Sequence, residues 1–332
     1  MRIGFGKVDI TPRVGVPLAG FGPFLHRTSV AVRDRLWARA MAVEQEGRRV
    51  VVVGCDLSSL TLQVTDEVRG RVGQSRGLAP AAVMIACTHT HSGPDTREGV
   101  IGWGGYDPPY MKLMPRRLVA AIEQAIDDLD DAELHHVQTP CEGIALNRER
   151  DRDAPPIDEA LAEDWRPALP EWTEAFCHVL KVTRGGRLRG FVSCFSCHPV
   201  VCCARNRHIH GDFVGVATNM LEREHPGSIA FFLQGASGDI NSCVVHKAEQ
   251  ESLRALDIIA SRYANAVRQG LSEAEPVADA TIGAVMRDVN FERRPWTLDQ
   301  IERRLDDEQR LIDAADADDQ DTAYRLAVVR AL

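Results

Sequence analysis

An apolar run, Ala81-Ala82-Val83-Met84-Ile85-Ala86-Cys87, leads directly into the polar loop Thr88-His89-Thr90-His91-Ser92-Gly93-Pro94. Such a short run predicts a buried β-strand, and the Gly-Pro pair ends any regular element. A loop that follows a buried strand is the usual position of a site in an α/β protein. Side chains at i and i+2 of a strand point the same way, so His89 and His91 face one pocket if the strand persists through them. Imidazole binds metals and transfers protons near neutral pH, so the pair suggests a metal or proton-transfer site. The alternative is that both are ordinary surface histidines.

Two later strands are predicted to end in the same manner. The apolar run Leu188 to Phe195 leads into Cys197-His198-Pro199, and Ile229 to Leu233 leads into a loop of small and polar residues that carries Asp239 and Asn241. α/β folds build active sites from the ends of several strands. We therefore expect a single site where these three loops meet.

The composition is that of an ordinary globular protein, with 332 residues, 44% hydrophobic and 26% charged. A net charge of −9 and a pI of about 5.7 make a polyanion such as nucleic acid a poor partner. The N-terminus shows no signal peptide, and no apolar run is long enough to cross a bilayer. The chain has nine cysteines, several within apolar runs, which fits buried reduced thiols better than a disulfide framework. We expect a cytoplasmic protein without a transmembrane segment.

Hydrophobic periodicity predicts an α/β fold in which mixed β-sheets are flanked by helices. We expect helices over residues 60–76, 115–129, 212–224, 250–270 and 298–332. Strands are expected over 2–10, 36–43, 49–54, 81–87, 133–144 with an interruption at Pro140, 176–182, 188–195, 229–233 and 278–289. Pro115 suits the first turn of its helix. The polar stretch 149–170 is expected to be a long surface excursion, either a lid or specificity element or a solvated insertion.

Three other patterns raise competing chemistries, and the sequence argues against each of them. Cys194-Phe195-Ser196-Cys197-His198 has the C-x-x-C-H spacing of a c-type haem attachment site, but it lies in a strand-like run and the chain shows no export signal. Cysteines along one strand and its end do not resemble the flexible knuckle of a thiolate zinc site. Gly235-Ala236-Ser237-Gly238 lacks the G-x-S-x-G spacing of a nucleophile elbow.

Asp56 and the histidines of His208-Ile209-His210-Gly211-Asp212 also have ordinary structural explanations. Asp56 follows a predicted strand, where it either supports a histidine or caps the next helix. The second histidine pair lies in a polar segment. We expect surface histidines before a helix capped by Asp212, with membership of a metal site as the alternative.

Several short motifs follow one another between Gly4 and Asn241. They are Gly4-x-Gly6-Lys7-Val8-Asp9-Ile10-Thr11-Pro12, Leu18-Ala19-Gly20-Phe21-Gly22, Thr88 to Pro94, Asn147-Arg148, Cys197-His198-Pro199, Gly211-Asp212-Phe213-x-Gly215 and Gln234-Gly235-Ala236-x-Gly238-Asp239-Ile240. In this order they resemble the N-terminal catalytic domain of neutral/alkaline (non-lysosomal) ceramidases, and the His-x-His-Ser-Gly-Pro element is the most specific of them. That family consists of zinc-dependent amidases that cleave an N-acyl bond, in the best-known members that of ceramide.

The resemblance implies a chemical role for four residues. His89 and His198 would be ligands of Zn²⁺. His91 would act at the water that the metal activates or at the developing oxyanion, and Arg148 would polarise or orient the substrate. Zinc lowers the pKa of bound water to about 7 and polarises a carbonyl, and a neighbouring imidazole can carry a proton to the leaving amine.

The resemblance also implies that Gly22, Asp239 and Asn241 bind the substrate. Asn241 stands where ceramide-cleaving members carry a serine, so details of substrate binding can differ. The family's other two zinc ligands, a glutamate and a tyrosine from a later stretch, have no match here. Either the sequence is truncated, or His208, His210 or Asp212 completes the site.

We therefore expect a ceramidase-like catalytic domain over residues 1–295 and an acidic helical extension over 296–332. The predicted function is zinc-dependent hydrolysis of an N-acyl amide in a small-molecule or lipid-like substrate. The low aromatic content of 6% and the missing export signal favour a substrate other than ceramide itself. A metal-poor or inactive binding domain and an esterase using the same site are the alternatives. The sequence does not indicate an oligomeric state.

Overall fold

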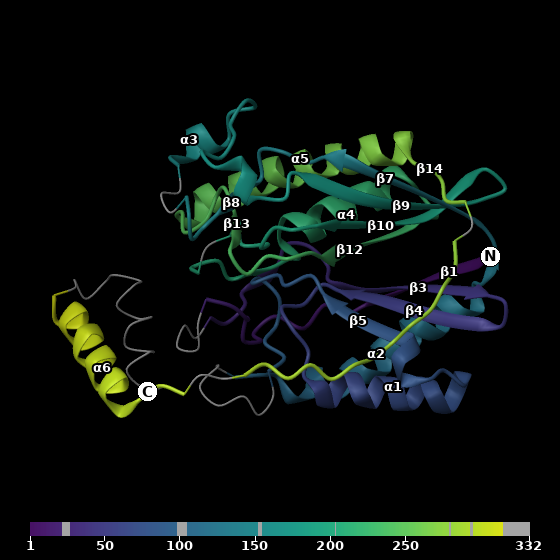
Figure 1. Ribbon diagram of the computed structural model, residues 1–332, viewed down its shortest axis with the longest axis horizontal. Coiled ribbons are helices and arrows are strands. Elements are labelled where there is room, and N and C mark those ends of the chain that lie inside the picture. Colours follow the sequence, from purple (N-terminus) through teal and green to yellow (C-terminus); the bar gives the residue numbers. More distant parts are fainter. Residues whose placement is uncertain are drawn as a thin grey trace.

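Two β-sheets pack face to face, and helices cover the outer face of each, so that the fold has four layers (Figure 1). The computed structural model describes residues 1–21, 27–97, 105–151, 155–202, 204–278, 280–292 and 295–314. The prediction of an α/β fold with mixed sheets and flanking helices is confirmed.

The first sheet has the strand order β5-β4-β3-β1-β6. Its strands are β1 (Arg2–Asp9), β3 (Trp37–Gln45), β4 (Arg48–Cys55), β5 (Val83–Cys87) and β6 (Asp130–Asp131), and helices α1 (Leu62–Arg76) and α2 (Pro108–Asp127) cover it. Gly4 and Gly6 allow β1 to lie directly against α2. A Cβ at these positions would lie 2.2 and 2.1 Å from the carbonyl oxygens of Ala125 and Ala121.

The second sheet has the order β12-β10-β9-β7-β14. Its strands are β7 (Glu133–Pro140), β9 (Phe176–Arg184), β10 (Arg187–Phe195), β12 (Ile229–Gln234) and β14 (Glu275–Pro276), and helices α4 (Asp212–Glu224) and α5 (Glu249–Glu273) cover it. Short pairs form between β2 (Ala31–Val32) and β11 (His208–Ile209), and between β8 (Ala145–Asn147) and β13 (Ile240–Ser242). The remaining helices are α3 (Ile157–Ala160), α6 (Leu298–Asp313) and 3-10 turns at Pro80–Ala82 and Pro170–Trp172.

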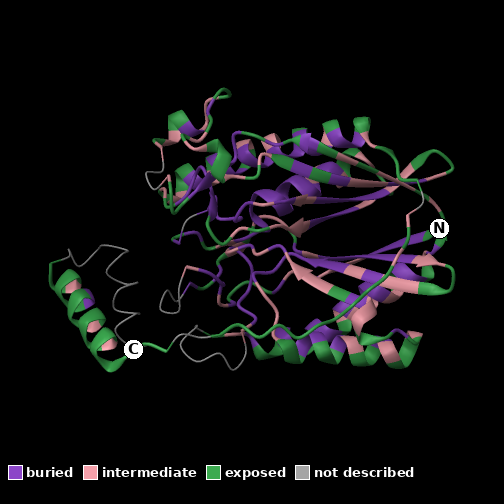
Figure 2. Ribbon diagram, in the orientation of Figure 1, coloured by how far each residue is buried: buried purple, intermediate pink, exposed green. Residues whose placement is uncertain are grey.

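The buried residues follow these layers (Figure 2). One apolar cluster lies between the first sheet and α1 and α2, and another lies between the second sheet and α4 and α5. A smaller cluster that includes Ile3, Phe5 and Phe231 joins the two sheets. Full burial of one such side chain stabilises the fold by about 1.5–3 kcal/mol, so these clusters hold the four layers together.

Each large sheet contains a parallel pair of strands, β4 with β5 and β10 with β12. Within each pair the last residues are in register, Cys55 with Cys87 and Phe195 with Gln234. Parallel neighbours end on the same side of a sheet, which is where α/β proteins bind ligands. The loops that follow β5, β10 and β12 therefore leave the sandwich at one end, near β8 and β13 (Figure 1).

Two predictions about individual elements are wrong. Helix α2 begins at Pro108, so Pro115 lies inside the helix; the apolar pattern already starts at the buried Tyr110 and Met111. Residues 280–289 are not a strand, because none of the described strands pairs with this stretch. The predicted interruption of the run 133–144 at Pro140 is confirmed, since β7 ends at Pro140 and the chain pairs again in β8.

Helix α6 stands apart from the four layers (Figure 1). Residues 315–332, which were predicted to continue it, lie outside the described residues. The division of the chain at residue 295 stays a prediction. None of the described helices combines the length and the apolar character that a bilayer-spanning helix requires.

A buried arginine connects the two halves of the sandwich. Arg39 of β3 pairs with Asp56 at 2.9 Å and with Glu222 of α4 at 3.1 Å. Asp56 also accepts a hydrogen bond from the backbone N–H of Trp37. Both roles predicted for Asp56 are therefore wrong: its carboxylate pairs with Arg39 rather than with a histidine, and the side chain of Thr61 caps α1.

Candidate active site

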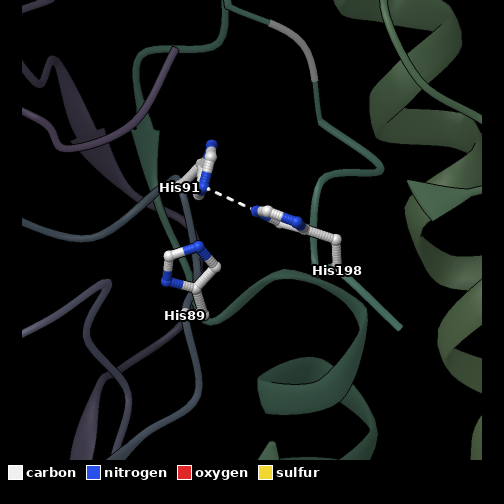
Figure 3. Close-up of side chains that lie close together, drawn as sticks. All are labelled: His89, His91 and His198. Carbon is white, nitrogen blue, oxygen red and sulfur yellow. Dashed lines mark hydrogen bonds between the residues drawn. The ribbon is translucent and has the colours of Figure 1, made fainter. Parts of the chain in front are cut away.

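Three imidazoles meet at the carboxyl ends of β5 and β10 (Figure 3). The ring centroid of His89 lies 5.1 Å from that of His91 and 4.5 Å from that of His198, and the last two are 4.8 Å apart. One ring nitrogen from each residue lies within 4.8 Å of the other two. Two loops from different sheets thus form one cluster of nitrogen donors, as the sequence predicts.

His89 is placed by a backbone turn and not by the strand. β5 ends at Cys87, and His89 has a φ of 67°. This value lies in the left-handed region, which residues other than glycine rarely adopt. The strand does not persist through the two histidines, so strand alternation does not apply to them, although both reach one site. The Nδ1 of His89 lies 2.8 Å from the carbonyl oxygen of Ser58. A carbonyl only accepts, so Nδ1 carries the proton and the Nε2 lone pair is available to a metal.

His198 has the same tautomer. Its Nδ1 lies 3.2 Å from the carbonyl oxygen of Ser237, and its backbone N–H donates to the carbonyl of Ile240. Burial and the neighbouring His89 lower the pKa of His198 to about 4. The ring is therefore neutral at pH 7, as a metal ligand must be.

His91 is the third imidazole, and its Nε2 lies 3.0 Å from the Nε2 of His198. Burial, together with the two neighbouring imidazoles, lowers the pKa of His91 well below its usual value. Its Nδ1 is buried and has no hydrogen-bond partner among the described residues. The ring of Phe21 meets that of His91 edge-on at 4.9 Å. A neutral imidazole with an unpaired nitrogen is suited to proton transfer.

Gly20→Ala is expected to displace His91. A Cβ at Gly20 would lie 2.3 Å from the Cγ of His91, and the φ of Gly20 is +86°. Gly15 is a matched control, because its φ is +93° but a Cβ there meets no atom within 4 Å. Both substitutions introduce about 1–2 kcal/mol of backbone strain, but only Gly20→Ala should shift the imidazole ¹⁵N resonances of His91. Identical His91 resonances in the two variants would contradict this expectation.

Arg148, Asp239 and Asn241 lie beside His198. The backbone N–H of Arg148 donates to the carbonyl of Asp239 at 2.8 Å, and its guanidinium donates to the carbonyl of Gly238. The charge of Arg148 contributes to the lowered pKa of His198. The carboxylate of Asp239 accepts a hydrogen bond from the side chain of Asn147, and Asn241 forms a β-bridge with His198. Their contact with substrate stays a prediction, and Gly22 lies outside the described residues.

His208, His210 and Asp212 do not join the three-histidine group within the described ranges. The imidazole of His208 lies 3.6 Å from the carboxylate of Glu249. His210 is fully buried, so the prediction of a surface histidine is wrong for this residue. Its segment packs against the loop of Thr90 instead of facing solvent, because the Thr90 hydroxyl donates to the His210 carbonyl.

A second group of possible ligands consists of Cys202, His210 and Asp212, but its hydrogen bonds suit a metal poorly. The carboxylate of Asp212 already accepts from the backbone N–H groups of Val201 and Cys202. Both ring nitrogens of His210 already have partners, since Nδ1 accepts from the N–H of Asp212 and Nε2 lies 3.2 Å from the side-chain amide nitrogen of Asn206. Neither ring nitrogen then offers a free lone pair. We therefore treat the group as structural.

His210→Gln is expected to make folding less sensitive to acid. Burial lowers the pKa of His210 from 6.5 to about 3. Below pH 6.5 the unfolded chain binds a proton at this residue that the folded chain does not, so wild-type stability falls as pH falls. Lowering the pH from 7 to 5 should therefore reduce the free energy of unfolding of the metal-free wild type by about 2 kcal/mol more than that of the variant. Urea unfolding of both proteins at the two pH values measures the difference; parallel pH dependences would contradict the burial of His210.

The three-histidine group fits a zinc ion by the chemistry of its donors. Zinc binds imidazole nitrogens, and structural support of a ligating histidine usually comes from a carbonyl or carboxylate at its other nitrogen. His89 and His198 both have this support, and His91 has an unpaired buried nitrogen. No cysteine, aspartate or glutamate joins the group in the described part of the chain.

The residues that hold these histidines carry no sequence pattern. Ser58 and Ser237 act through their backbone carbonyls, so their side-chain type gives no indication of the contact. Arg27 donates to the carbonyls of His91 and Asn206 at 2.6 and 2.9 Å and connects two loops that are distant in sequence. Only the tertiary structure reveals these contacts.

Comparison with known proteins agrees with the motifs. The family described as neutral/alkaline non-lysosomal ceramidase, N-terminal, matches residues 1–284. A neutral ceramidase from Pseudomonas aeruginosa is 26% identical over 259 residues, which are 72% of this chain and 37% of that protein.

Solved structures show the same fold. The crystal structure of the Pseudomonas aeruginosa neutral ceramidase aligns with a TM-score of 0.68 at 23% identity, over 82% of this chain and 45% of that one. A ceramidase complexed with C2 gives a TM-score of 0.68 at 24% identity, over 82% and 44%. The chain thus spans less than half the length of these relatives. Because the family match covers most of its residues, the chain belongs to the neutral/alkaline non-lysosomal ceramidase family.

Proposed function

We propose that this chain carries the metal-binding and proton-transfer histidines of a zinc-dependent hydrolase that cleaves N-acyl amide bonds. The observation that carries the proposal is the convergence of His89, His91 and His198, two of which present Nε2 while a carbonyl holds Nδ1. Family membership supports the same class of bond, since the curated relative is named a neutral ceramidase.

His89 and His198 would hold the zinc ion through Nε2. When bound, zinc would polarise the amide carbonyl and make water acidic enough to attack it near neutral pH. Two imidazoles leave room for further ligands and for substrate. The fixed orientation of both rings means that little reorganisation is needed when the metal binds.

His91 would take the proton of the attacking water and deliver it to the leaving amine. This role requires a neutral ring, and burial keeps the pKa of His91 low enough for that. Arg148 would orient the acyl carbonyl, because a guanidinium remains charged and its position is fixed by the Gly238 carbonyl. Gly22, Asp239 and Asn241 would line the substrate position around these groups.

A panel of N-acyl amides tests the proposal. The panel varies the acyl chain and the amine, includes ceramide, and is paired with esters of the same acyl groups. We expect amide cleavage that stops when a chelator removes zinc and returns when zinc is added back. Turnover of esters alone would assign an esterase to the same site. Zinc binding without turnover of either series would contradict catalysis and favour a binding domain.

A further inference from the structure

The two histidine loops come from different sheets, and no β-ladder among the described strands fixes the distance between them. His89 and His91 follow β5 of the first sheet, and His198 follows β10 of the second. Residues 206–212 pass between these loops and are hydrogen bonded to both. We infer that Asp212 is a positioning residue for His198, and that the segment 206–212 sets the separation of the two loops. The inference rests on the proposed function of the histidines.

The segment is connected to the first loop by three hydrogen bonds. The N–H of His210 donates to the carbonyl of Ser92 at 3.1 Å, and the hydroxyl of Thr90 donates to the carbonyl of His210 at 3.0 Å. The side-chain amide of Asn206 donates to the hydroxyl of Ser92 at 3.0 Å. All of these side chains are fully buried, so water does not compete for the bonds. Thr90 and Ser92 flank His91 directly.

The segment is connected to the second loop through one carboxylate. Asp212 accepts hydrogen bonds from the N–H groups of Val201 and Cys202, both at 3.2 Å, and from that of Phe213 at 2.8 Å. Val201 and Cys202 lie a few residues after His198 in the same loop. Without the carboxylate, two buried N–H groups lose their acceptor, which is unfavourable enough to make the loop move. The movement would carry His198 away from His89.

The backbone of Asp212 is strained in order to make these contacts. Its φ is 53°, a conformation that side chains other than Asn and Asp rarely adopt. A strained residue persists only where its surroundings hold it. Glycine at this position would relieve the strain but remove the carboxylate, so positioning of the loop can be separated from stability of the fold. Asparagine tolerates the same φ and keeps one oxygen acceptor.

The experiment compares Asp212→Gly, Asp212→Asn and Thr218→Ala with the wild type. Thr218 is a buried α4 residue whose hydroxyl bonds only within the helix, to the Val214 carbonyl, so its loss perturbs α4 without releasing either loop. Chelator competition measures zinc affinity, amide turnover gives kcat and KM separately, and imidazole ¹⁵N spectra of the metal-free proteins report the Nδ1 bond of His198. We expect Asp212→Gly to weaken zinc binding about 10- to 100-fold and to change the His198 resonances. Asp212→Asn should recover part of the affinity, and Thr218→Ala should lower Tm alone.

Two results would overturn the inference. One is wild-type zinc affinity and an unchanged His198 resonance in Asp212→Gly. The other is an equal loss of affinity in Thr218→Ala, because general destabilisation of α4 would then explain both. If the wild type itself takes up no zinc, the proposed function fails, and the spectra of the metal-free proteins alone decide whether Asp212 positions His198. A change of the His198 resonances in Asp212→Gly without such a change in Thr218→Ala supports the positioning role.

Discussion

His91→Ala is expected to retain zinc and lose turnover, whereas His89→Ala and His198→Ala lose both. The carbonyls of Ser58 and Ser237 hold the Nδ1 atoms of His89 and His198, so that Nε2 of each ring carries the lone pair a metal can bind. The ring of His91 has no such support among the described residues, and its Nδ1 is unpaired. Loss of a general acid–base lowers kcat by about 10²- to 10⁴-fold. Zinc content per chain and kcat, measured on the same preparations, give the comparison.

A surface histidine provides the control for this series. His136 of β7 is exposed and lies 3.3 Å from the exposed His178 of β9, and His136→Ala should change neither zinc content nor kcat. Loss of zinc in His91→Ala would contradict the division of roles, because all three imidazoles would then be ligands. Loss of zinc in His136→Ala would place metal on the surface pair instead.

The strands that deliver the site could be predicted because their pattern is local. β5, β10 and β12 are short apolar runs that end in polar loops, and both properties follow from residue type alone. The expectation that these loops meet also holds for His89, His91 and His198. The geometry inside the loops could not be predicted, since φ at His89 is positive and the alternation of a strand does not apply.

Burial of polar residues was beyond prediction, because it depends on partners distant in sequence. His210 lies in a polar segment and is nevertheless fully buried, because Thr90 and Ser92 supply its backbone partners. The opposite error concerns residues 280–289, whose apolar alternation predicts a strand. A strand requires a neighbouring strand to pair with, and none of the described strands pairs with these residues; Val285 and Val289 are exposed.

Arg39→Met is expected to lower the free energy of unfolding by about 3–5 kcal/mol, the range for removing one partner of a buried ion pair. The side chain of Arg39 is 2% exposed, and it pairs with Asp56 and Glu222. Glu222 retains Lys7 at 2.5 Å after the substitution, but Asp56 loses its guanidinium and keeps only the N–H of Trp37. Urea unfolding of the metal-free protein at pH 7 measures the loss. Arg268→Met is the control, because its pair with Glu224 is solvent-exposed and worth about 0–1 kcal/mol.

The part of this destabilisation that comes from the unpaired charge on Asp56 can be separated from the part that comes from lost packing. In the wild type burial raises the pKa of Asp56, and Arg39 opposes the shift. Without Arg39 the pKa of Asp56 should rise further, so that the folded variant binds a proton at a pH where its unfolded chain does not. The deficit of Arg39→Met should therefore shrink as pH falls from 7 toward 5, and Arg39→Met combined with Asp56→Asn should recover part of it at pH 7. A deficit that is independent of pH and unchanged in the double variant would show that Arg39 contributes packing alone, and that the charge on Asp56 is not what couples α4 to the first sheet.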